Sequence, residues 1–277
     1  MEIPSSVTDL IHRALEEDTG PCDITTFLLI PEDSKSRALY IAKEKFILAG
    51  IPFTQEVFRV LDPSTSFKIF YNEGTKVRKG DVIAEVSGKT RTILTGERVS
   101  LNILQRLSGI ASLTNKYVER VKGLNAKIVD TRKTVPCHRF MEKYAVRIGG
   151  GGNHRFGLFD GILIKDNHIE AVGSINEAVR LAKHSHHLTR IEVEVENLHD
   201  LNKAIEAGAD IVMLDNMSTN DIREAVKISK GRVILEASGG IKLENVREIA
   251  ETGVDLISVG ALTNSAAAVD ISLKIVN

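Results

Sequence analysis

The chain has 277 residues, of which 26% are charged and 43% hydrophobic, and its formal net charge is -1. This length can bury one large core or two smaller ones, and the near-neutral charge gives no reason to expect nucleic acid or an anionic membrane as a partner. No apolar run approaches the roughly 20 residues of a membrane span, and the first residues lack the pattern of a secretory signal. The two cysteines, Cys22 and Cys137, form no close pair. We therefore expect no disulfide and no zinc site, and a cytoplasmic location.

The first part of the chain mixes helical and strand patterns. Residues 5–17 have the apolar spacing of an amphipathic helix, residues 37–49 are typical of a pair of strands, and Pro52 begins a second helix over 52–61. Short alternating runs broken by glycines over 73–88 indicate a small β-sandwich or barrel, and residues 94–121 are helical in period. We predict an N-terminal α+β domain, of a barrel-sandwich or hammerhead-like kind.

The stretch 73–88 also resembles the lipoyl and biotinyl carrier fold, which favours an alternative function as a non-enzymatic carrier module. A carrier needs a modified lysine at a tight hairpin tip. Here the corresponding place is Gly88-Lys89-Thr90, without the flanking residues of those domains. The likeness therefore indicates a fold and not a function.

From Ala126 onward, strand patterns alternate with helical ones. Strands are predicted to begin near Lys127, Ile162, Ile191, Ile211, Val233 and Leu256, with helices over 198–207, 221–229 and 243–250. This alternation predicts parallel strands joined by crossover helices, and hence a β/α barrel that is incomplete or open. We predict an α/β protein with domains 1–108 and 109–265, the tail 266–277 joining the first.

Positive charge is concentrated between Arg132 and His168, where seven Lys or Arg and three His face three acids, and where four glycines follow one another from Gly149. Clustered cations attract small multivalent anions. The alternative interpretation, a solvated basic surface, is disfavoured because Arg132 and Lys165 directly follow apolar strand-like runs. We therefore expect an anion-binding site.

Polar residues follow each predicted strand of the barrel, where active sites of this fold gather. In chain order they are Arg132 and Lys133; Lys165; Glu194, which shares a face with Glu192 and Glu196; Asp215; Ser238, Gly239 and Gly240; and Gly260 with Ala261. The order runs from cations through carboxylates to free backbone N–H groups. It suits a ligand with carboxylates, a magnesium-bound pyrophosphate and a phosphate. Alternatively, an inward Glu simply pairs with a lysine.

His184, His186 and His187 invite a metal-site interpretation. They lack a carboxylate at ligand spacing and precede a strand, which places them at the opposite end of the barrel from the predicted site. We predict a solvated helix end instead.

Four strings carry a family resemblance: Thr131-Arg-Lys-Thr, Glu142-Lys-Tyr-Ala-Val, the Gly-Gly-Gly-Asn-His-Arg that ends at Arg155, and Leu163-Ile-Lys-Asp-Asn-His. They resemble quinolinate phosphoribosyltransferase, a type II phosphoribosyltransferase also called nicotinate-nucleotide pyrophosphorylase (carboxylating). One departure is Cys137-His138, where many members carry Gly and an apolar residue. The resemblance implies transfer of phosphoribosyl from phosphoribosyl pyrophosphate to quinolinate, which yields nicotinate mononucleotide, pyrophosphate and CO2 for NAD biosynthesis.

The resemblance and the residue chemistry together give hypotheses for single residues. Arg132, His154 and Arg155 bind the quinolinate carboxylates, with Arg98 reaching in from a neighbouring subunit of a homodimer or larger homo-oligomer. Lys133, Lys165, Glu194 and Asp215 are the candidate catalytic residues, and the two acids also hold Mg²⁺ and ribose hydroxyls. The other predicted substrate contacts are Thr131, Asn167, His168, Ser238, Gly239, Gly240, Val259, Gly260 and Ala261.

Two close alternatives remain within the same scaffold. One is the paralogue found with molybdate transport, which uses another acid, and the other is a nicotinate-using relative. The intact Lys165-Asp-Asn-His string favours quinolinate over the first. The cationic cluster exceeds what the single carboxylate of nicotinate needs.

Overall fold

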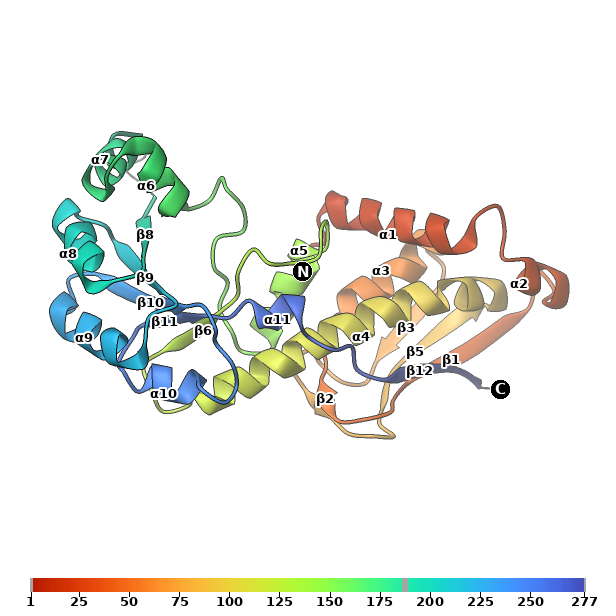
Figure 1. Ribbon diagram of the computed structural model, residues 1–277. Coiled ribbons are helices and arrows are strands. Elements are labelled where there is room, and N and C mark those ends of the chain that lie inside the picture. Colours follow the sequence, from red (N-terminus) through yellow and green to blue (C-terminus); the bar gives the residue numbers. More distant parts are fainter. Residues whose placement is uncertain (1, 186–188, 277) are drawn as a thin grey trace. The chain divides into compact units, whose positions relative to one another are not determined.

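The computed structural model describes residues 2–185 and 189–276 (Figure 1). The chain divides into two compact units. The first holds residues 1–113, 135–150 and 266–277, and the second holds residues 114–134 and 151–265. Helix α4 (Thr90–Arg120) contributes residues to both units. The predicted α/β class is confirmed, with an α+β first unit and a parallel β/α second unit.

The first unit is built on an antiparallel sheet with the strand order β12-β1-β5-β3. Tyr40 on β1 lies opposite Leu273 and Ala84, and its ring is fully buried with Phe58 and Ile83 in the core of this unit. The described strands are β1 (Lys35–Ala42), β3 (Ser66–Ile69), β5 (Val82–Lys89), β12 (Ile271–Val276) and the short pair β2 (Phe46–Ile47) and β4 (Lys76–Val77).

The two strands predicted within 37–49 exist, but they do not pair with each other. β1 is bonded to β12 and β5, while β2 pairs with β4. Both edges of β1 are therefore occupied by distant strands, which local sequence does not reveal. The hairpin tip that the alternative carrier function would require at Gly88-Lys89-Thr90 is not formed, because Lys89 ends β5 and α4 begins at Thr90.

Two helices of the first unit, α1 (Ser5–Thr19) and α3, begin within one residue of their predicted starts, whereas α4 begins four residues earlier than predicted and α2 and α5 were not predicted. Helix α3 (Ile51–Leu61) starts after Gly50, whose φ of 111° would strain any other residue, and Pro52 occupies its first turn. Helix α1 buries Val7, Ile11 and Leu15 on one face. The remaining helices are α1 (Ser5–Thr19), α2 (Ile24–Leu29) and α5 (Arg139–Ile148).

Residues 135–150, which the sequence placed in the 109–265 domain, lie in the first unit. Glu142 is 1% exposed and accepts hydrogen bonds from Nε and Nη2 of Arg106 at 3.1 and 2.8 Å. The Tyr144 hydroxyl donates to Glu73 at 2.9 Å, and its ring packs edge-on against Phe53. These buried contacts are long-range in sequence, so local pattern does not predict them.

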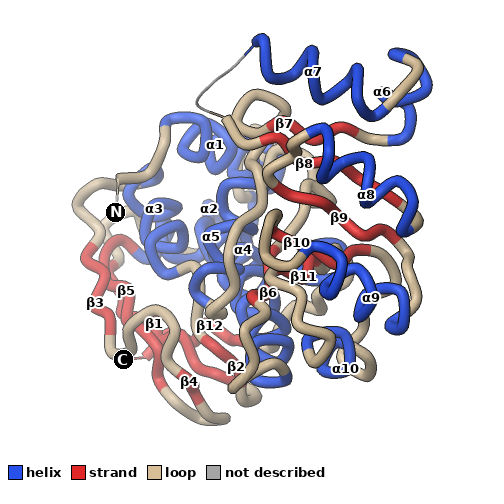
Figure 2. The backbone as a smooth tube through the Cα atoms, turned by 90° about the vertical axis from the view of Figure 1, so that its left-hand side faces the viewer, coloured by secondary structure: helices blue, strands red, loops and turns tan. Residues whose placement is uncertain are grey.

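The second unit is a parallel sheet of six described strands in the order β6-β11-β10-β9-β8-β7, with crossover helices along its outer side (Figures 1 and 2). The strands are β6 (Lys127–Val129), β7 (Ile162–Ile164), β8 (Ile191–Val195), β9 (Ile211–Asp215), β10 (Ile234–Ser238) and β11 (Leu256–Ser258). The helices are α6 (Asp166–Val172), α7 (Ile175–Ser185), α8 (Leu198–Ala207), α9 (Thr219–Ser229), α10 (Val246–Ala250) and α11 (Ala261–Asn264).

The edge strands β6 and β7 do not pair with each other within the described residues, so the barrel is open, as predicted. The chain after the glycine run lies along the free edge of β6: the Gly152 amide donates to Ile128 at 2.8 Å, and the Asp130 amide donates to Gly152 at 3.2 Å. This segment occupies part of the opening between the two edges. Residues 153–155 are thereby placed at the interior of the barrel.

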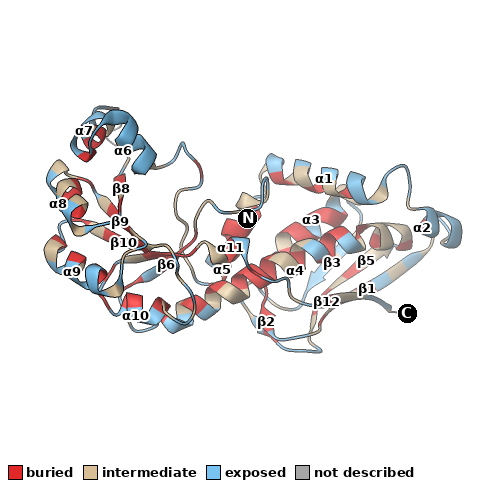
Figure 3. Cartoon of the chain, viewed as in Figure 1, coloured by how far each residue is buried: buried red, intermediate tan, exposed pale blue. Residues whose placement is uncertain are grey.

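Burial explains why the strands are so apolar. Parallel strands covered by helices are buried on both faces, and Val193, Val212, Leu214 and Ala237 are fully buried (Figure 3). Side-chain caps fix the starts of two crossover helices; Asn197, for example, accepts a hydrogen bond from the Asp200 amide. Among the helices that the structure describes, none is both long enough and apolar enough to cross a membrane.

Candidate active site

A cavity of about 560 Å³ opens at the carboxyl ends of the barrel strands in the second unit. Its volume suits a small ligand. It is lined by Thr131, Arg132, Lys133, His154, Arg155, Leu163, Lys165, Glu194, Met213, Asp215, Asn216, Glu236, Ser238, Gly239, Gly240 and Ser258. Residues that lie far apart in sequence therefore converge on one space. This is the arrangement that the strand-end argument predicts.

Most of the predicted site residues line this cavity, from Thr131 and Arg132 after β6 to Gly240 after β10. Five predicted residues of the same unit lie outside the lining: Asn167, His168, Val259, Gly260 and Ala261. Gly260 is nevertheless close, because a Cβ built on it would lie 3.1 Å from Cδ of Lys133. Val259 is buried, and its amide donates to Val129 at 2.9 Å.

The cationic wall is held by backbone contacts. Nη1 of Arg155 donates to the Gly161 carbonyl at 3.0 Å. Burial, and then the neighbouring Arg132 guanidinium, lower the pKa of Arg155. The Lys133 amide donates to the Thr131 hydroxyl at 3.0 Å, and its carbonyl accepts from Thr263 at 2.7 Å. Two guanidiniums held this close together suit an anion with more than one negative charge.

The acidic wall contains Glu194 and Asp215. The Lys165 ammonium donates a hydrogen bond to Oε2 of Glu194. This is the pairing of an inward glutamate with a lysine that the alternative interpretation of the sequence predicts. The Lys165 side chain is 43% exposed, so the pair is open to competition from a ligand. Asp215 accepts a hydrogen bond from Asn216 at 2.7 Å. Two carboxylates in one cavity supply the hard oxygen donors that Mg²⁺ prefers.

The third wall is backbone. Gly239 has a φ of 85°, and a Cβ there would lie 2.3 Å from Oδ1 of Asn216, so no side chain fits. Gly240 also has positive φ, at 63°. The Asn216 amide donates to the Ser238 carbonyl at 3.0 Å and joins this turn to the end of β9. Exposed backbone at such a turn is suited to phosphate oxygens.

His154, Glu192 and Glu236 form a polar cluster at the inner end of the cavity, where His154 and Glu236 belong to its lining. Nε2 of His154 is 3.0 Å from Oε2 of Glu192 and 3.7 Å from Oε2 of Glu236. Burial, and then the Glu192 carboxylate, raise the pKa of Glu236 to about 7, while His154 and the Ser258 hydroxyl lower it. His154, Glu192 and Glu236 could by residue type hold a metal. However, the Arg155 amide donates to Nδ1 of His154 at 2.9 Å, which puts the ring proton on Nε2 and opposes coordination there.

Two predicted pyrophosphate contacts have local structural roles. Nδ1 of His168 accepts from the Lys165 amide at 2.9 Å and caps helix α6, and both Asn167 and His168 are exposed. At the end of α7, His184 is exposed; His186 and His187 lie outside the described residues.

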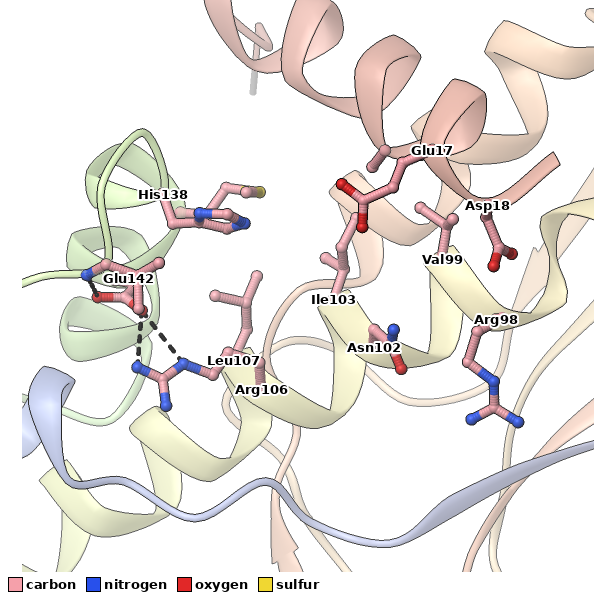
Figure 4. A pocket seen from close by; sticks show the side chains of 13 residues that line it. Glu17, Asp18, Arg98, Val99, Asn102, Ile103, Arg106, Leu107, His138 and Glu142 are labelled. Carbon is pink, nitrogen blue, oxygen red and sulfur yellow. Dashed lines mark hydrogen bonds and ion pairs between the residues drawn. The ribbon is translucent and has the colours of Figure 1, made fainter. Parts of the chain in front are cut away.

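Arg98 lies in the first unit and lines a separate cavity of about 330 Å³ there. Figure 4 shows it on helix α4 near Asp18; farther along α4, Arg106 pairs with Glu142 of α5. Arg98 is exposed. Burial raises the pKa of the neighbouring Glu97, and the positive charge of Arg98 opposes this larger effect by lowering it.

Comparison with known proteins decides the family. The family "Quinolinate phosphoribosyl transferase, C-terminal domain" matches residues 110–274, and the corresponding N-terminal domain matches residues 23–108. The chain belongs to the quinolinate phosphoribosyltransferase family.

Two relatives of this quinolinate phosphoribosyltransferase chain are each named "Probable nicotinate-nucleotide pyrophosphorylase [carboxylating]". The one from Bacillus subtilis is 45% identical, with 96% of this chain and 92% of the relative covered. The one from Methanocaldococcus jannaschii is 46% identical, with 96% of each covered. A solved nicotinate-nucleotide pyrophosphorylase from Francisella tularensis is 47% identical and superimposes with a TM-score of 0.95 over 99% of this chain and 98% of that one.

Sequence reasoning assigned no role to Asn216, which directly follows Asp215 at the end of a predicted strand. It missed other residues that line the site of this quinolinate phosphoribosyltransferase chain: Glu236, Leu163, Met213 and Ser258. A signal for Glu236 exists: it lies two positions before Ser238, so alternation along β10 puts both on one face. Asn216 has a φ of 53°, in the left-handed region, and the local sequence pattern does not predict this conformation.

Proposed function

We propose that the chain transfers the phosphoribosyl group of phosphoribosyl pyrophosphate to the ring nitrogen of quinolinate and releases CO2, giving nicotinate mononucleotide for NAD biosynthesis. The observation that carries this proposal is the single cavity with a cationic, an acidic and a backbone wall. The names of the relatives support the choice of acid. The cavity also explains why no nucleophile and base pair is needed, since a pyridine nitrogen already has a lone pair.

The reaction then depends on positioning two anions. Arg132 and Arg155 hold the two carboxylates of quinolinate, and Lys133 lies between the two substrates. His154 lines the same wall and contacts the bound acid through its ring. The ring nitrogen forms a bond to C1 of ribose as the bond to pyrophosphate breaks. The nitrogen becomes positive and stabilises the carbanion that departing CO2 leaves at the neighbouring carbon, and this carbon then gains a proton. The two half-buried guanidiniums match two adjacent carboxylates, which nicotinate lacks.

The phosphate and pyrophosphate groups occupy the rest of the cavity. Lys165, with Asn167 and His168 beyond it, faces the pyrophosphate. Thr131 joins the substrate contacts, and the backbone of Ser238, Gly239, Gly240, Val259, Gly260 and Ala261 holds the 5′-phosphate. Lys133, Lys165, Glu194 and Asp215 are the catalytic residues of this proposal.

Glu194 and Asp215 are the residues that would hold Mg²⁺, because both carboxylates line the cavity beside Lys165. When bound, the ion neutralises the charge of the leaving pyrophosphate. The two acids also accept hydrogen bonds from the ribose hydroxyls. Lys165 must break its ion pair with Glu194 to reach the pyrophosphate. Substrate binding therefore replaces Glu194 by the pyrophosphate as the partner of the Lys165 ammonium.

We further propose a homodimer or larger homo-oligomer in which Arg98 enters the site of a neighbouring subunit. Its exposure and its place in the lining of a cavity support this role. A cytoplasmic location is part of the same proposal, since Cys22 and Cys137 are both free and exposed, as a reducing compartment permits.

The test is release of labelled CO2 from quinolinate by the purified protein, with phosphoribosyl pyrophosphate or Mg²⁺ omitted in turn. We expect release only when both are present, and restoration when Mg²⁺ is returned after chelation. Release without phosphoribosyl pyrophosphate, or none from quinolinate while another acid forms a nucleotide, would overturn the proposed reaction.

A further inference from the structure

Two buried acids, Asp130 and Glu192, form hydrogen bonds to the segment 153–155 that carries Arg155. Asp130 is fully buried; its Oδ1 accepts from the His154 amide at 2.9 Å and its Oδ2 from the Asn153 side chain at 2.7 Å. Glu192 is 5% exposed, and its Oε2 lies 3.0 Å from Nε2 of His154. Asp130 follows β6 and Glu192 lies on β8. The segment along the open edge of the barrel is therefore held from two sides.

The hydrogen bonds set the tautomer of His154. The Arg155 amide donates to Nδ1 at 2.9 Å, so Nδ1 is an acceptor and carries no proton. The ring proton is then on Nε2, which donates to Glu192. A doubly protonated ring would direct a second N–H at the Arg155 amide. One continuous series of bonds thus runs from Arg155 through the neutral imidazole to Glu192.

Arg155 needs such support. Burial and the nearby Arg132 disfavour its charge, while Glu192 is the first of the groups that favour it. Its guanidinium is fixed to the Gly161 carbonyl. Glu192 itself does not line the substrate cavity; it lines a second cavity of about 420 Å³ below, at the opposite end of the strands. Any effect of Glu192 on the substrate must therefore pass through other residues.

We propose that Glu192 is a positioning residue for the carboxylate-binding wall: it fixes the ring of His154 and, through the Arg155 amide, the position of Arg155. The inference rests on the proposed function, since it concerns how quinolinate is held. It makes a distinct prediction about chemistry, because the hydrogen-bond acceptor of Glu192 matters more for the role than its negative charge does.

The experiment compares Glu192→Ala, Glu192→Gln and Glu196→Ala. Glu196 is the matched control, an exposed glutamate just beyond the same strand. We expect Glu192→Ala to raise the KM for quinolinate about tenfold or more, with the KM for phosphoribosyl pyrophosphate unchanged. Glu192→Gln should stay within about threefold of wild type, because an amide carbonyl still accepts from Nε2. Glu196→Ala should not differ from wild type.

Loss of affinity for both substrates in Glu192→Ala, or equal damage by Ala and Gln, overturns the inference. If Glu192→Ala does not fold, ¹⁵N-histidine spectra of wild type decide, with His154 assigned by difference from His154→Asn. We expect a neutral ring protonated at Nε2, and a doubly protonated ring or the other tautomer refutes the proposal. Failure of the proposed function is separate, because it shows as absent wild-type turnover of quinolinate.

Discussion

Replacement of Arg155 by Ala tests the cationic wall most directly. The guanidinium lines the cavity, and its removal deletes a charge-assisted bond to a substrate carboxylate. Such a bond contributes about 1.5–3 kcal/mol, which corresponds to a fall of about 10- to 150-fold in kcat/KM for quinolinate. We expect the lower part of this range, because Arg132 disfavours the charge of Arg155 and loss of one cation relieves that repulsion.

The variant also loses the hydrogen bond from Nη1 to Gly161. This costs about 0.5–1.5 kcal/mol, a small part of the 5–15 kcal/mol typical of folded domains. The protein should therefore remain folded, as checked by circular dichroism. Initial rates of CO2 release are measured against quinolinate at saturating phosphoribosyl pyrophosphate. The matched control is Arg180→Ala, which removes an exposed arginine paired with Glu177 on α7. Wild-type kcat/KM in folded Arg155→Ala would falsify the assignment.

Three further predictions concern the assembly, the core and pH. Arg98→Ala and Lys133→Ala, each inactive alone, should partly recover activity when co-expressed, because a mixed oligomer assembles one intact site. Glu142→Ala should lower the free energy of unfolding by about 3 kcal/mol in urea titrations, the lower end for a buried pair, since it leaves the half-buried Arg106 without its carboxylate. The stabilising effect of Glu56 relative to Glu56→Gln should be lost at low pH. The hydrogen bond from Arg59 is the largest of the effects that lower the pKa of Glu56 below 4.5. The contribution is therefore complete above pH 4.5 and disappears as the pH falls through the lowered value.

Each of these has a clear opposing result. No recovery after demonstrated subunit mixing argues against a shared site. The control for Glu142→Ala is Glu177→Ala, which breaks an exposed pair and should cost less than about 1 kcal/mol; equal costs would show that burial of Glu142 is unimportant. A difference between wild type and Glu56→Gln that stays constant down to pH 2 would contradict the ion-pair account.

The sequence alone determined the class of the barrel and most of its site. Parallel strands alternate with helices at a regular spacing, and each strand ends in polar residues, so strand ends such as Arg132, Lys165 and Asp215 must meet at one edge of the sheet. This conclusion depends only on the direction of the strands, and it requires no knowledge of which side chains are in contact. It correctly brought together residues from Thr131 to Gly240.

Only the tertiary structure decided what holds those residues in place. Glu192 and Asp130 look like ordinary strand residues, and their bonds to the 153–155 segment depend on how that segment lies along the open edge of the barrel. Likewise, residues 135–150 join the first unit through buried partners far away in sequence. The spacing of apolar residues predicts which face of a helix or strand is buried. The residue that pairs with a buried charge depends on which elements pack together in the folded protein.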